Sequence, residues 1–533
     1  MSTLFRQTCL QVFKAQHLQF QSKAFEYLEG VFKENEVPEE EERTALLYIA
    51  REYIKQNKAG IVTRKKLKQV VTSLQVAKTQ ENNPENDEES FDIDYDKFFN
   101  VISSFDMPRI EYEPSIKNFK SIEKHPRFIG DETSRSILFK GRYNLLIQRL
   151  LRNELFSPVR FDNTDSAKFH LTSIKDLRGR TQKEFLLFGM LTKINEGKYY
   201  LEDADDKIEL DFSEMSAPSS ICTSHSFQLV HGTYNEETEI FHASYIGNPP
   251  VEKRSDTRNA YGNVDFLGIQ KQTTNESLLM LYQEKWQHIM FVVVSDVWLD
   301  QEQTLDKLRK MFKEYHKNGM TPFAFIFIGN FSYEPFKLGI GQSRRYTEMF
   351  NTLGELISEF ENIANHSHFI FVPGPGDPYV GGALPYMPIP ERYTSRFKEY
   401  VKKAVFTSNP CRIQFLTQEI LIYREDLIDK FHRNLLLRGS NNNPDCYYQE
   451  VIKSIIDQSH ISPFKLSVRP VYWEFDHALR LYPLPNAFIM ADRFPQYTFD
   501  YTECHTLNPG SFNQGTKVQW MHYYPARNFS EHW

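Results

Sequence analysis

The chain has 533 residues, of which 40% are hydrophobic and 25% charged, and a formal net charge of −7 at pH 7. This length exceeds a single hydrophobic core, so we expect two to four folded domains. The acidic balance argues against a protein whose main task is to coat nucleic acid, and no apolar run approaches the 18 residues of a membrane-spanning helix.

Residues 1–77 are predicted to form a small helical domain. Leu46, Ile49, Ala50, Tyr53 and Ile54 recur on one helical face, and a proline followed by four glutamates at 38–42 suits a helix start, because carboxylates are stabilised at the positive end of the helix dipole. The basic run at 64–68 is interpreted as a solvated helix face, with a partner contact or a nuclear-import signal as the alternative.

Residues 78–90 (KTQENNPENDEES) are predicted to be an acidic linker, because they are polar, contain a proline and have nothing to bury. Residues 91–174 are predicted to be a wrapping segment followed by an amphipathic helix at 136–156. We interpret this helix as docked on the next domain. A nucleic-acid-facing arginine helix is the alternative, since Arg142, Arg149 and Arg152 lie on its polar side.

Residues 175–250 are predicted to form an OB-type barrel, because five short strands follow one another with tight turns. Such barrels often bind single strands, but here a cluster of carboxylates crowds one hairpin, with only Lys207 opposing it, and would repel phosphate. The carboxylates are those of Glu202, Asp203, Asp205, Asp206, Glu209 and Asp211. A structural or protein-binding barrel is the main interpretation and a single-strand reader the alternative.

Residues 251–533 are predicted to form an α/β domain. Three short apolar runs, at 290–294, 323–328 and 369–372, read as buried strands, and each ends in a polar or glycine-rich tip. The tips contain Asp296, Asn330 and Asp377. Because a sheet aligns the ends of its strands, we expect these side chains along one edge, where open α/β sheets place their ligands.

This order of tips resembles the calcineurin-like metallophosphoesterases. Active members carry D-x-H, G-D, G-N-H-[DE], a distant His and G-H-x-H, which together hold two divalent ions and a general acid. The resemblance implies an α/β phosphoesterase-like sandwich, which with the predicted N-terminal helical domain and OB-type β-barrel gives an α+β multidomain chain. A run at 507–511 (LNPGS) matches the N-P-G-S that follows G-H-x-H in active members.

The chain departs from that pattern at nearly every tip, so the active site is expected to be degenerate. An aspartate remains at the first tip, but tryptophan replaces the histidine, an asparagine removes the bridging carboxylate, and the third tip has lost its asparagine and histidine. The eroded positions are Asp296, Trp298, Asn330, Pro375, Gly376, Asp377, Asp492 and Phe494. We therefore expect no catalytic residue, no bound metal and no cofactor.

Other candidate sites are weak. His505 lies beside Cys504, while His460, His477 and His522 are isolated, and all four are interpreted as structural. The chain has five cysteines and no C-x-x-C pair, which predicts reduced thiols in an intracellular protein. The absence of H-E-x-x-H, Walker A and G-x-S-x-G runs leaves nucleotide hydrolysis and serine catalysis without support.

A barrel before an eroded phosphoesterase resembles the small B subunits of replicative DNA polymerases, in particular those of the epsilon type. The resemblance is carried by runs at 142–152, 295–300, 408–414 and 468–473, and by the helical N-terminal domain. It implies a nuclear, non-catalytic subunit that binds the zinc-containing C-terminal region of the catalytic subunit. It also implies contact of the N-terminal domain with the GINS part of the helicase, small histone-fold subunits in the same complex, and only indirect or weak contact with DNA.

Three hypotheses follow from the sequence. The first is this scaffold subunit, which would show no phosphodiesterase activity and would co-purify with a large polymerase chain. The second is a metal-dependent phosphodiesterase with atypical ligands, whose activity would be lost on replacing Asp296 or Asp377. The third is a single-stranded DNA-binding barrel, whose binding would weaken with salt.

Overall fold

The computed structural model describes residues 95–156, 169–180, 183–195, 197–215, 217–262, 264–269, 276–378, 381–439, 446–513 and 518–533, together with scattered positions before residue 95. The chain divides into two compact units, Met1–Asp94 and Tyr95–Trp533. Among the described residues, no helix combines the length and the hydropathy needed to cross a membrane.

The first unit contains helix α2 (Ser22–Glu34) and a parallel pair of two-residue strands, β1 (Gln19–Phe20) and β2 (Ile61–Val62). Leu46 and Ile49 of the predicted apolar face are buried, as is Leu67. Arg64, Lys66 and Lys68 are exposed, as a solvated basic face requires. Ala50, Tyr53, Ile54 and the predicted linker at 78–90 lie outside the described residues.

The second unit is built around two six-stranded sheets. The first has the order β15-β14-β13-β12-β22-β23, and its strands are β12 (Phe291–Ser295), β13 (Ala324–Ile328), β14 (His368–Val372), β15 (Ala404–Phe406), β22 (Met521–Tyr524) and β23 (Phe529–His532). Strands β12 to β15 run parallel to one another. Strand β22 pairs antiparallel with β12, and β23 pairs antiparallel with β22. Because β12, β13 and β14 consist almost wholly of apolar residues, they suit the centre of a sheet covered on both faces.

The second sheet has the order β20-β21-β19-β17-β16-β3. Its strands are β3 (Phe99–Ser103), β16 (Cys411–Phe415), β17 (Gln418–Arg424), β19 (Ala487–Ala491), β20 (Tyr497–Tyr501) and β21 (Cys504–Asn508). The two sheets pack face to face, since the ring of Phe291 lies 5.6 Å from that of Phe415 and 5.9 Å from that of Phe99. The predicted wrapping segment thus supplies β3, the edge strand that pairs with β16.

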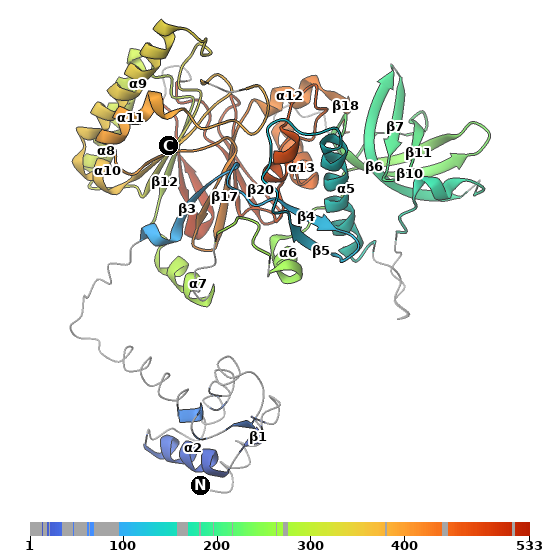
Figure 1. Ribbon diagram of the computed structural model, residues 1–533, viewed down its shortest axis with the longest axis horizontal. Helices are drawn as coiled ribbons and strands as arrows, with labels where there is room; N and C mark the ends of the chain where they lie inside the picture. The colour runs from blue at the N-terminus through green and yellow to red at the C-terminus, as the bar shows by residue number, and fades with distance from the viewer. Residues whose placement is uncertain are drawn as a thin grey trace. The chain divides into compact units, whose positions relative to one another are not determined.

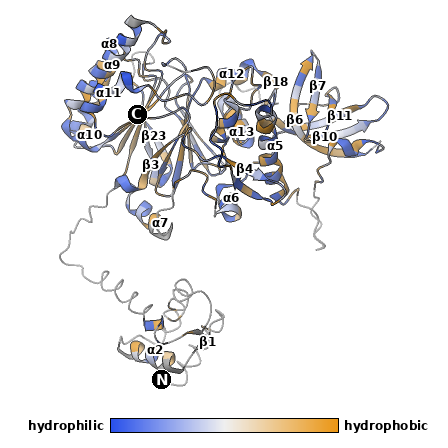
Figure 2. Cartoon of the chain, in the orientation of Figure 1, coloured by the Kyte–Doolittle hydropathy of each residue, from blue (hydrophilic) through white to orange (hydrophobic). Residues whose placement is uncertain are grey.

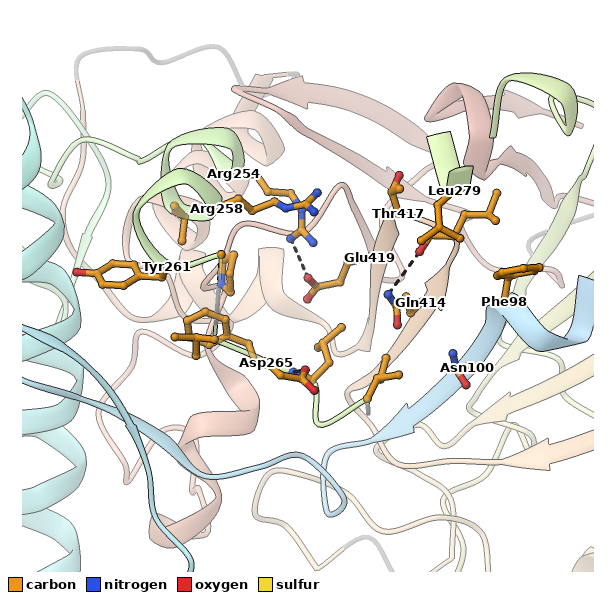
Figure 3. Close-up of a pocket in the computed structure, with 18 of the residues that line it drawn as sticks. Phe98, Asn100, Arg254, Arg258, Tyr261, Asp265, Leu279, Gln414, Thr417 and Glu419 are labelled. Atoms are coloured by element: carbon orange, nitrogen blue, oxygen red, sulfur yellow. Dashed lines mark hydrogen bonds and ion pairs between the residues drawn. The ribbon is translucent and has the colours of Figure 1, made fainter. Parts of the chain in front are cut away.

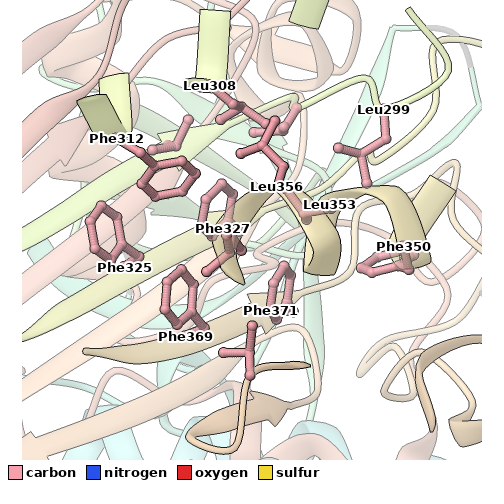
Figure 4. Close-up of a cluster of buried hydrophobic side chains, with 14 of the residues drawn as sticks. Leu299, Leu308, Phe312, Phe325, Phe327, Phe350, Leu353, Leu356, Phe369 and Phe371 are labelled. Carbon is pink, nitrogen blue, oxygen red and sulfur yellow. The ribbon is translucent and has the colours of Figure 1, made fainter. Parts of the chain in front are cut away.

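Helices cover the outer face of each sheet (Figure 1). On the first sheet these are α8 (Glu302–Lys317), α9 (Ile340–Ser358), α10 (Glu361–His366) and α11 (Glu391–Tyr400). Figure 4 shows phenylalanines of β13 and β14 packed beneath α8 and α9. Phe325 stacks on Phe369 at 5.1 Å, and Phe327 stacks on Phe371 at 5.4 Å. Burying each such ring contributes about 2–3 kcal/mol, so this layer fixes the positions of the strand tips.

The second sheet is covered by α12 (Leu427–Arg433) and α13 (Tyr447–Asp457), whose apolar residues pack on Leu421, Phe488 and Met490. Two further helices, α6 (Arg254–Tyr261) and α7 (Glu276–Lys285), lie between the barrel and β12 in the sequence. In Figure 2 the central strands are coloured mainly hydrophobic and the covering helices carry both colours, as amphipathic helices on a buried sheet do.

A closed five-stranded barrel forms at the positions predicted. Its strands are β6 (Glu184–Asn195), β7 (Lys198–Glu202), β8 (Lys207–Asp211), β10 (Phe227–Asn235) and β11 (Ile240–Gly247). Strands β8 and β11 pair in parallel and close the barrel. At Gly232 a Cβ atom would lie 2.0 Å from the His242 carbonyl oxygen, so only glycine permits the close approach of β10 and β11 there.

Helix α5 (Ser134–Arg152) joins the barrel to the α/β domain, preceded by the hairpin of β4 (Ile110–Glu113) and β5 (Asn118–Ser121). Its leucines pack on barrel residues that include Phe188 and Phe227. The nucleic-acid-facing interpretation of this helix is wrong for Arg142 and Arg149, because both guanidinium groups are buried in contacts with the α/β domain.

Candidate functional site

The first three strand tips meet at the carboxyl end of the first sheet, as expected from their order. The Asn330 N–H donates to Asp296 Oδ1 at 3.0 Å, and the Gly376 N–H donates to Asn330 Oδ1 at 2.7 Å. Strands β12, β13 and β14 are parallel neighbours, which places their C-terminal ends side by side. All three polar side chains, Asp296, Asn330 and Asp377, are buried.

A buried arginine from the opposite sheet occupies the space beside Asp296. The Arg424 Nη2 atom lies 2.9 Å and 3.2 Å from the two carboxylate oxygens of Asp296, and both side chains are at most 1% exposed. Arg424 also donates to the Gly329 carbonyl at 2.9 Å and to Asp426 at 2.7 Å. Its guanidinium is therefore the buried cation that pairs with the Asp296 carboxylate in the interior.

Sequence reasoning missed Arg424. The signal that could have found it is an arginine that ends an apolar strand, 418–424 (QEILIYR), in a domain whose other strand ends carry carboxylates. An arginine at such a position either pairs with a buried carboxylate or extends into the solvent. The pairing itself joins residues 128 positions apart, which no local pattern encodes.

Asp377 is held by protein donors on both oxygens. The Phe331 N–H donates to Oδ1 at 2.9 Å, the Tyr346 hydroxyl to Oδ1 at 3.0 Å, and the Gly374 N–H to Oδ2 at 2.7 Å. Burial, partly opposed by these hydrogen bonds, raises the pKa of Asp377 to about 6. The carboxylate thus fixes the glycine-rich loop after β14.

Asp492 lies at the end of β19, in the second sheet. It accepts the Ile428 N–H at 3.1 Å and the Phe494 N–H at 3.0 Å, and burial raises its pKa to about 6. Phe494 packs near the rings of Tyr448 and Tyr497. Through these hydrogen bonds, Asp492 links α12 to the loop after β19.

These side chains do not fit a dinuclear metal centre. Such a centre needs several anionic or imidazole ligands in fixed geometry. Here Asp296 is bound by a guanidinium, and Asp377 accepts three protein donors. Trp298 offers no metal-binding atom, and its ring centroid lies 5.0 Å from that of Tyr333. Within the part of the chain that the structure describes, no three His, Cys, Asp or Glu side chains are grouped so as to hold a metal.

A hollow of about 820 Å³ opens above the tips. Trp298, Asn330, Pro375 and Gly376 line it, whereas the buried carboxylates of Asp296, Asp377 and Asp492 do not. The hollow is also lined by paired charges, among them Lys430, which lies 2.8 Å from Glu425. The shape of a site at the sheet edge is therefore present, and its walls are aromatic side chains, prolines and neutralised charges.

A second hollow, of about 460 Å³, lies between α6, β3 and the β16–β17 turn (Figure 3). Arg254 crosses it to bind Glu419 at 2.8 Å, and Tyr261 and Phe98 form parts of its wall. Its lining comes from segments far apart in the sequence, so no motif predicts it.

The predicted structural histidines are buried among protein partners. His505 bonds to Ser530 at 2.7 Å, His460 to Asp476 at 3.2 Å, and His522 to the Tyr315 hydroxyl at 2.6 Å. Burial lowers the pKa of His460 and of His522 to about 4. Cys504, next to His505, is also buried, which raises the pKa of its thiol to about 12.

The expectation that only Lys207 opposes the acidic hairpin of the barrel is wrong. Three other cations pair with it, Lys198 from β7 of the hairpin itself and Lys175 and Arg178 from the segment before β6, and His242 of β11 bonds to it as well. The contacts are the ion pairs Lys175–Asp205 at 2.6 Å, Arg178–Asp206 at 3.4 Å and Lys198–Glu209 at 3.1 Å, and the bond of His242 Nδ1 to Asp211 Oδ2 at 2.9 Å. The hairpin is a surface of mixed charge.

Comparison with known proteins agrees with this architecture. A family model for the B subunits of DNA polymerases alpha and epsilon matches residues 291–499, and one described as the OB-fold domain of DNA polymerase epsilon subunit 2-like proteins matches residues 132–250. A solved archaeal phosphodiesterase covers 46% of this chain and 99% of its own at 11% identity, with a TM-score of 0.25, which is too low to support an argument.

Two curated relatives match along most of their length. DNA polymerase epsilon subunit 2 of Bos taurus is 38% identical over 454 residues, which cover 83% of this chain and 84% of the relative. The Homo sapiens protein of that name is 39% identical over 435 residues, which cover 80% of this chain and 81% of the relative. The chain therefore belongs to the family of DNA polymerase epsilon subunit 2, an accessory subunit of that polymerase.

Proposed function

We propose that this accessory subunit of polymerase epsilon is non-catalytic and acts as a scaffold. Its barrel and α/β domain bind the C-terminal region of the catalytic subunit, and its N-terminal unit contacts the GINS part of the replicative helicase. The histone-fold subunits belong to the same complex. The subunit thereby ties the polymerase to the replication fork in the nucleus.

The observation that carries the non-catalytic part is the ion pair between Asp296 and Arg424. The guanidinium stands next to the aspartate that would be the first metal ligand of an active phosphoesterase. A divalent cation would have to displace it and would leave the guanidinium buried without that partner, which costs several kcal/mol. Asp377, with three protein donors, offers no free carboxylate in exchange.

Hydrolysis of bis-p-nitrophenyl phosphate with added Mn²⁺ tests this part. We expect the full chain and its Asp296→Ala variant to release nitrophenolate at the same background rate. Turnover that needs stoichiometric metal and disappears in Asp296→Ala and in Asp377→Ala would instead establish the metal-dependent phosphodiesterase.

An affinity pull-down tests the scaffold part. The full chain is expected to retain both the catalytic subunit and GINS, while residues 91–533 retain only the catalytic subunit. Retention of GINS by residues 91–533 would show that the helicase contact lies elsewhere. Failure of the full chain to retain the catalytic subunit would remove the scaffold proposal as a whole.

The single-strand reader is not favoured, since the basic side chains at the barrel hairpin are engaged by its carboxylates and leave no basic stripe there. Retention of the chain on a single-stranded DNA column at low salt, with steep loss on adding salt, would revive it.

A further inference from the structure

A third hollow, of about 380 Å³, lies where the first turn of α5 meets the loop 465–473 of the α/β domain. Its walls include Arg135, Lys465, Pro470 and Trp473. Barrel residues lie close by, because the ring of Phe139 on α5 is 5.5 Å from that of His225. The hollow thus opens where the barrel, α5 and the α/β domain come together.

The hollow is positively charged. Arg135 and Lys465 are exposed, and neither forms an ion pair with any residue that the structure describes. Burial lowers the pKa of His225 to about 4, and the nearby charges of Lys465 and Arg135 add to this effect. Two uncompensated cations therefore face the solvent at this point.

Three acids near the hollow are already engaged within the protein. Asp131 binds Arg127 at 3.0 Å, Glu474 accepts the Arg127 N–H at 2.8 Å, and Asp476 binds Arg142 at 2.6 Å. None of these three is left to neutralise Arg135 or Lys465, and the exposed Glu132, three residues before Arg135, forms no ion pair with either of them. An anionic group from another molecule would therefore meet two cations that have no ion-pair partner within the described chain.

Apolar side chains border the same hollow. Gly130 packs against the indole of Trp473, since a Cβ atom on it would lie 3.1 Å from Cε3 of that ring. Next to Gly130, Ile129 is 87% exposed, and the half-exposed ring of Phe128 lies 5.2 Å from that of Tyr472. Tryptophan and arginine are the residue types most enriched at the centres of protein interfaces, and exposed apolar neighbours mark the same kind of surface.

The surface is held in place by the fold. The Leu384 N–H donates to the Pro470 carbonyl at 3.0 Å, and the Tyr472 N–H donates back to the Leu384 carbonyl at 2.8 Å. A loop fixed in this way loses little conformational freedom when a partner binds, which favours affinity. We name Phe128, Ile129, Arg135, Lys465 and Trp473 the junction surface.

We propose that the junction surface docks an acidic segment of the polymerase epsilon catalytic subunit that also carries an apolar side chain. Carboxylates of the segment meet Arg135 and Lys465, and its apolar side chain packs against Ile129 and Trp473. This inference rests on the proposed function, because it names the face through which the scaffold holds its polymerase. A segment bound there would contact both α5, next to the barrel, and the α/β domain.

The test measures the affinity of the full chain for its cognate catalytic subunit by surface plasmon resonance at low and high salt. Reversing both charges, in Arg135→Glu/Lys465→Glu, is expected to weaken binding by about tenfold or more at low salt and to reduce the salt dependence. The exchange Arg135→Lys/Lys465→Arg keeps the charges and is expected to bind like the parent. A matched reversal of exposed lysines on α8, Lys310→Glu/Lys313→Glu, is also expected to leave the affinity unchanged.

The partner segment is identified with a photo-cross-linking amino acid at position 129, in the complex reconstituted from full chains. Cross-links to a catalytic-subunit segment rich in Asp and Glu would support the inference. Unchanged affinity of the Arg135→Glu/Lys465→Glu variant would overturn it while leaving the scaffold function intact. Loss of single-stranded DNA retention by that variant, with affinity for the catalytic subunit unchanged, would assign the surface to nucleic acid. Failure of the parent chain to bind at all would remove the proposed function and this inference with it.

Discussion

Arg424 and Asp296 form the contact that most restricts the chemistry of this domain. Both groups are fully buried, so the ion pair is stable only because nearly every donor and acceptor is used. A pair of this kind adds little net stability over an apolar pair of the same shape, but removing one partner leaves a charge in the interior.

Arg424→Gln is therefore expected to lower the free energy of unfolding by about 3–5 kcal/mol, because Asp296 and Asp426 lose their common partner. Arg433→Gln is the control: its side chain is 72% exposed and its pairing with Asp429 contributes little. Chemical denaturation of both variants measures the difference. Equal stability of the two would show that the buried pair does not hold the tips together.

The raised pKa of Asp377 predicts that the stability of the fold depends on pH. Its folded pKa of about 6 lies above the ordinary value of 3.8, so the folded state binds more protons than the unfolded chain between about pH 4 and 6. Asp377 therefore destabilises the fold increasingly as the pH rises through that range. The stability of Asp377→Asn relative to the parent is expected to improve by about 2 kcal/mol from pH 4.5 to pH 7. A difference that stays constant across this range, in urea titrations at both pH values, would contradict the assignment.

Helix α5 shows how an element can be predicted correctly and its surroundings misjudged. The apolar spacing predicts an amphipathic helix at 136–156, and α5 is found at Ser134–Arg152. Leu146 and Leu150 face the barrel, while Arg142 and Arg149 on its polar side are also buried, against the α/β domain. The helix thus has two buried sides, and its arginines join the two folded parts.

Arg142→Ala is expected to destabilise the contact between α5 and the α/β domain by about 3–5 kcal/mol, because Asp476 would lose its main partner in the interior. Arg142 holds the pKa of that carboxylate well below its usual range. Hydrogen exchange is expected to show faster exchange in α5 and at 473–479. Lys140→Ala, an exposed lysine on the same helix, serves as the control and should leave exchange unchanged.

At the scale of the molecule, the chain consists of a small N-terminal unit and a large unit that contains the barrel and both sheets. The large unit is tied together by β3, which pairs with β16 some 300 positions later, and by α5. We expect residues 95–533 alone to unfold at the same temperature as the large unit in the full chain. A lower melting temperature of the fragment, measured by calorimetry, would show that the N-terminal unit stabilises the rest.

The sequence predicts those parts of the fold that depend on local pattern. Strands β12, β13 and β14 are close to the predicted ranges, and the barrel strands lie within the predicted 175–250, because apolar runs bounded by turn residues are short-range signals. The resemblance to the small subunits of replicative polymerases rests on runs of the same kind, and the relatives confirm it. The eroded tips, too, are visible as the residue types that stand at each strand end.

Other features were decided by the tertiary structure alone. The pairing of Arg424 with Asp296, the pairing of Lys175 with Asp205 at the acidic hairpin, and the shared hollow of Arg135 and Lys465 join residues 30 to more than 300 positions apart. Electrostatic energy depends on distance in space and on burial, and neither is contained in the spacing of residues along the chain. The sequence by itself therefore determined which strands and helices form and to which family the chain belongs, while only the folded chain decided which charges are neutralised and which are left for a partner.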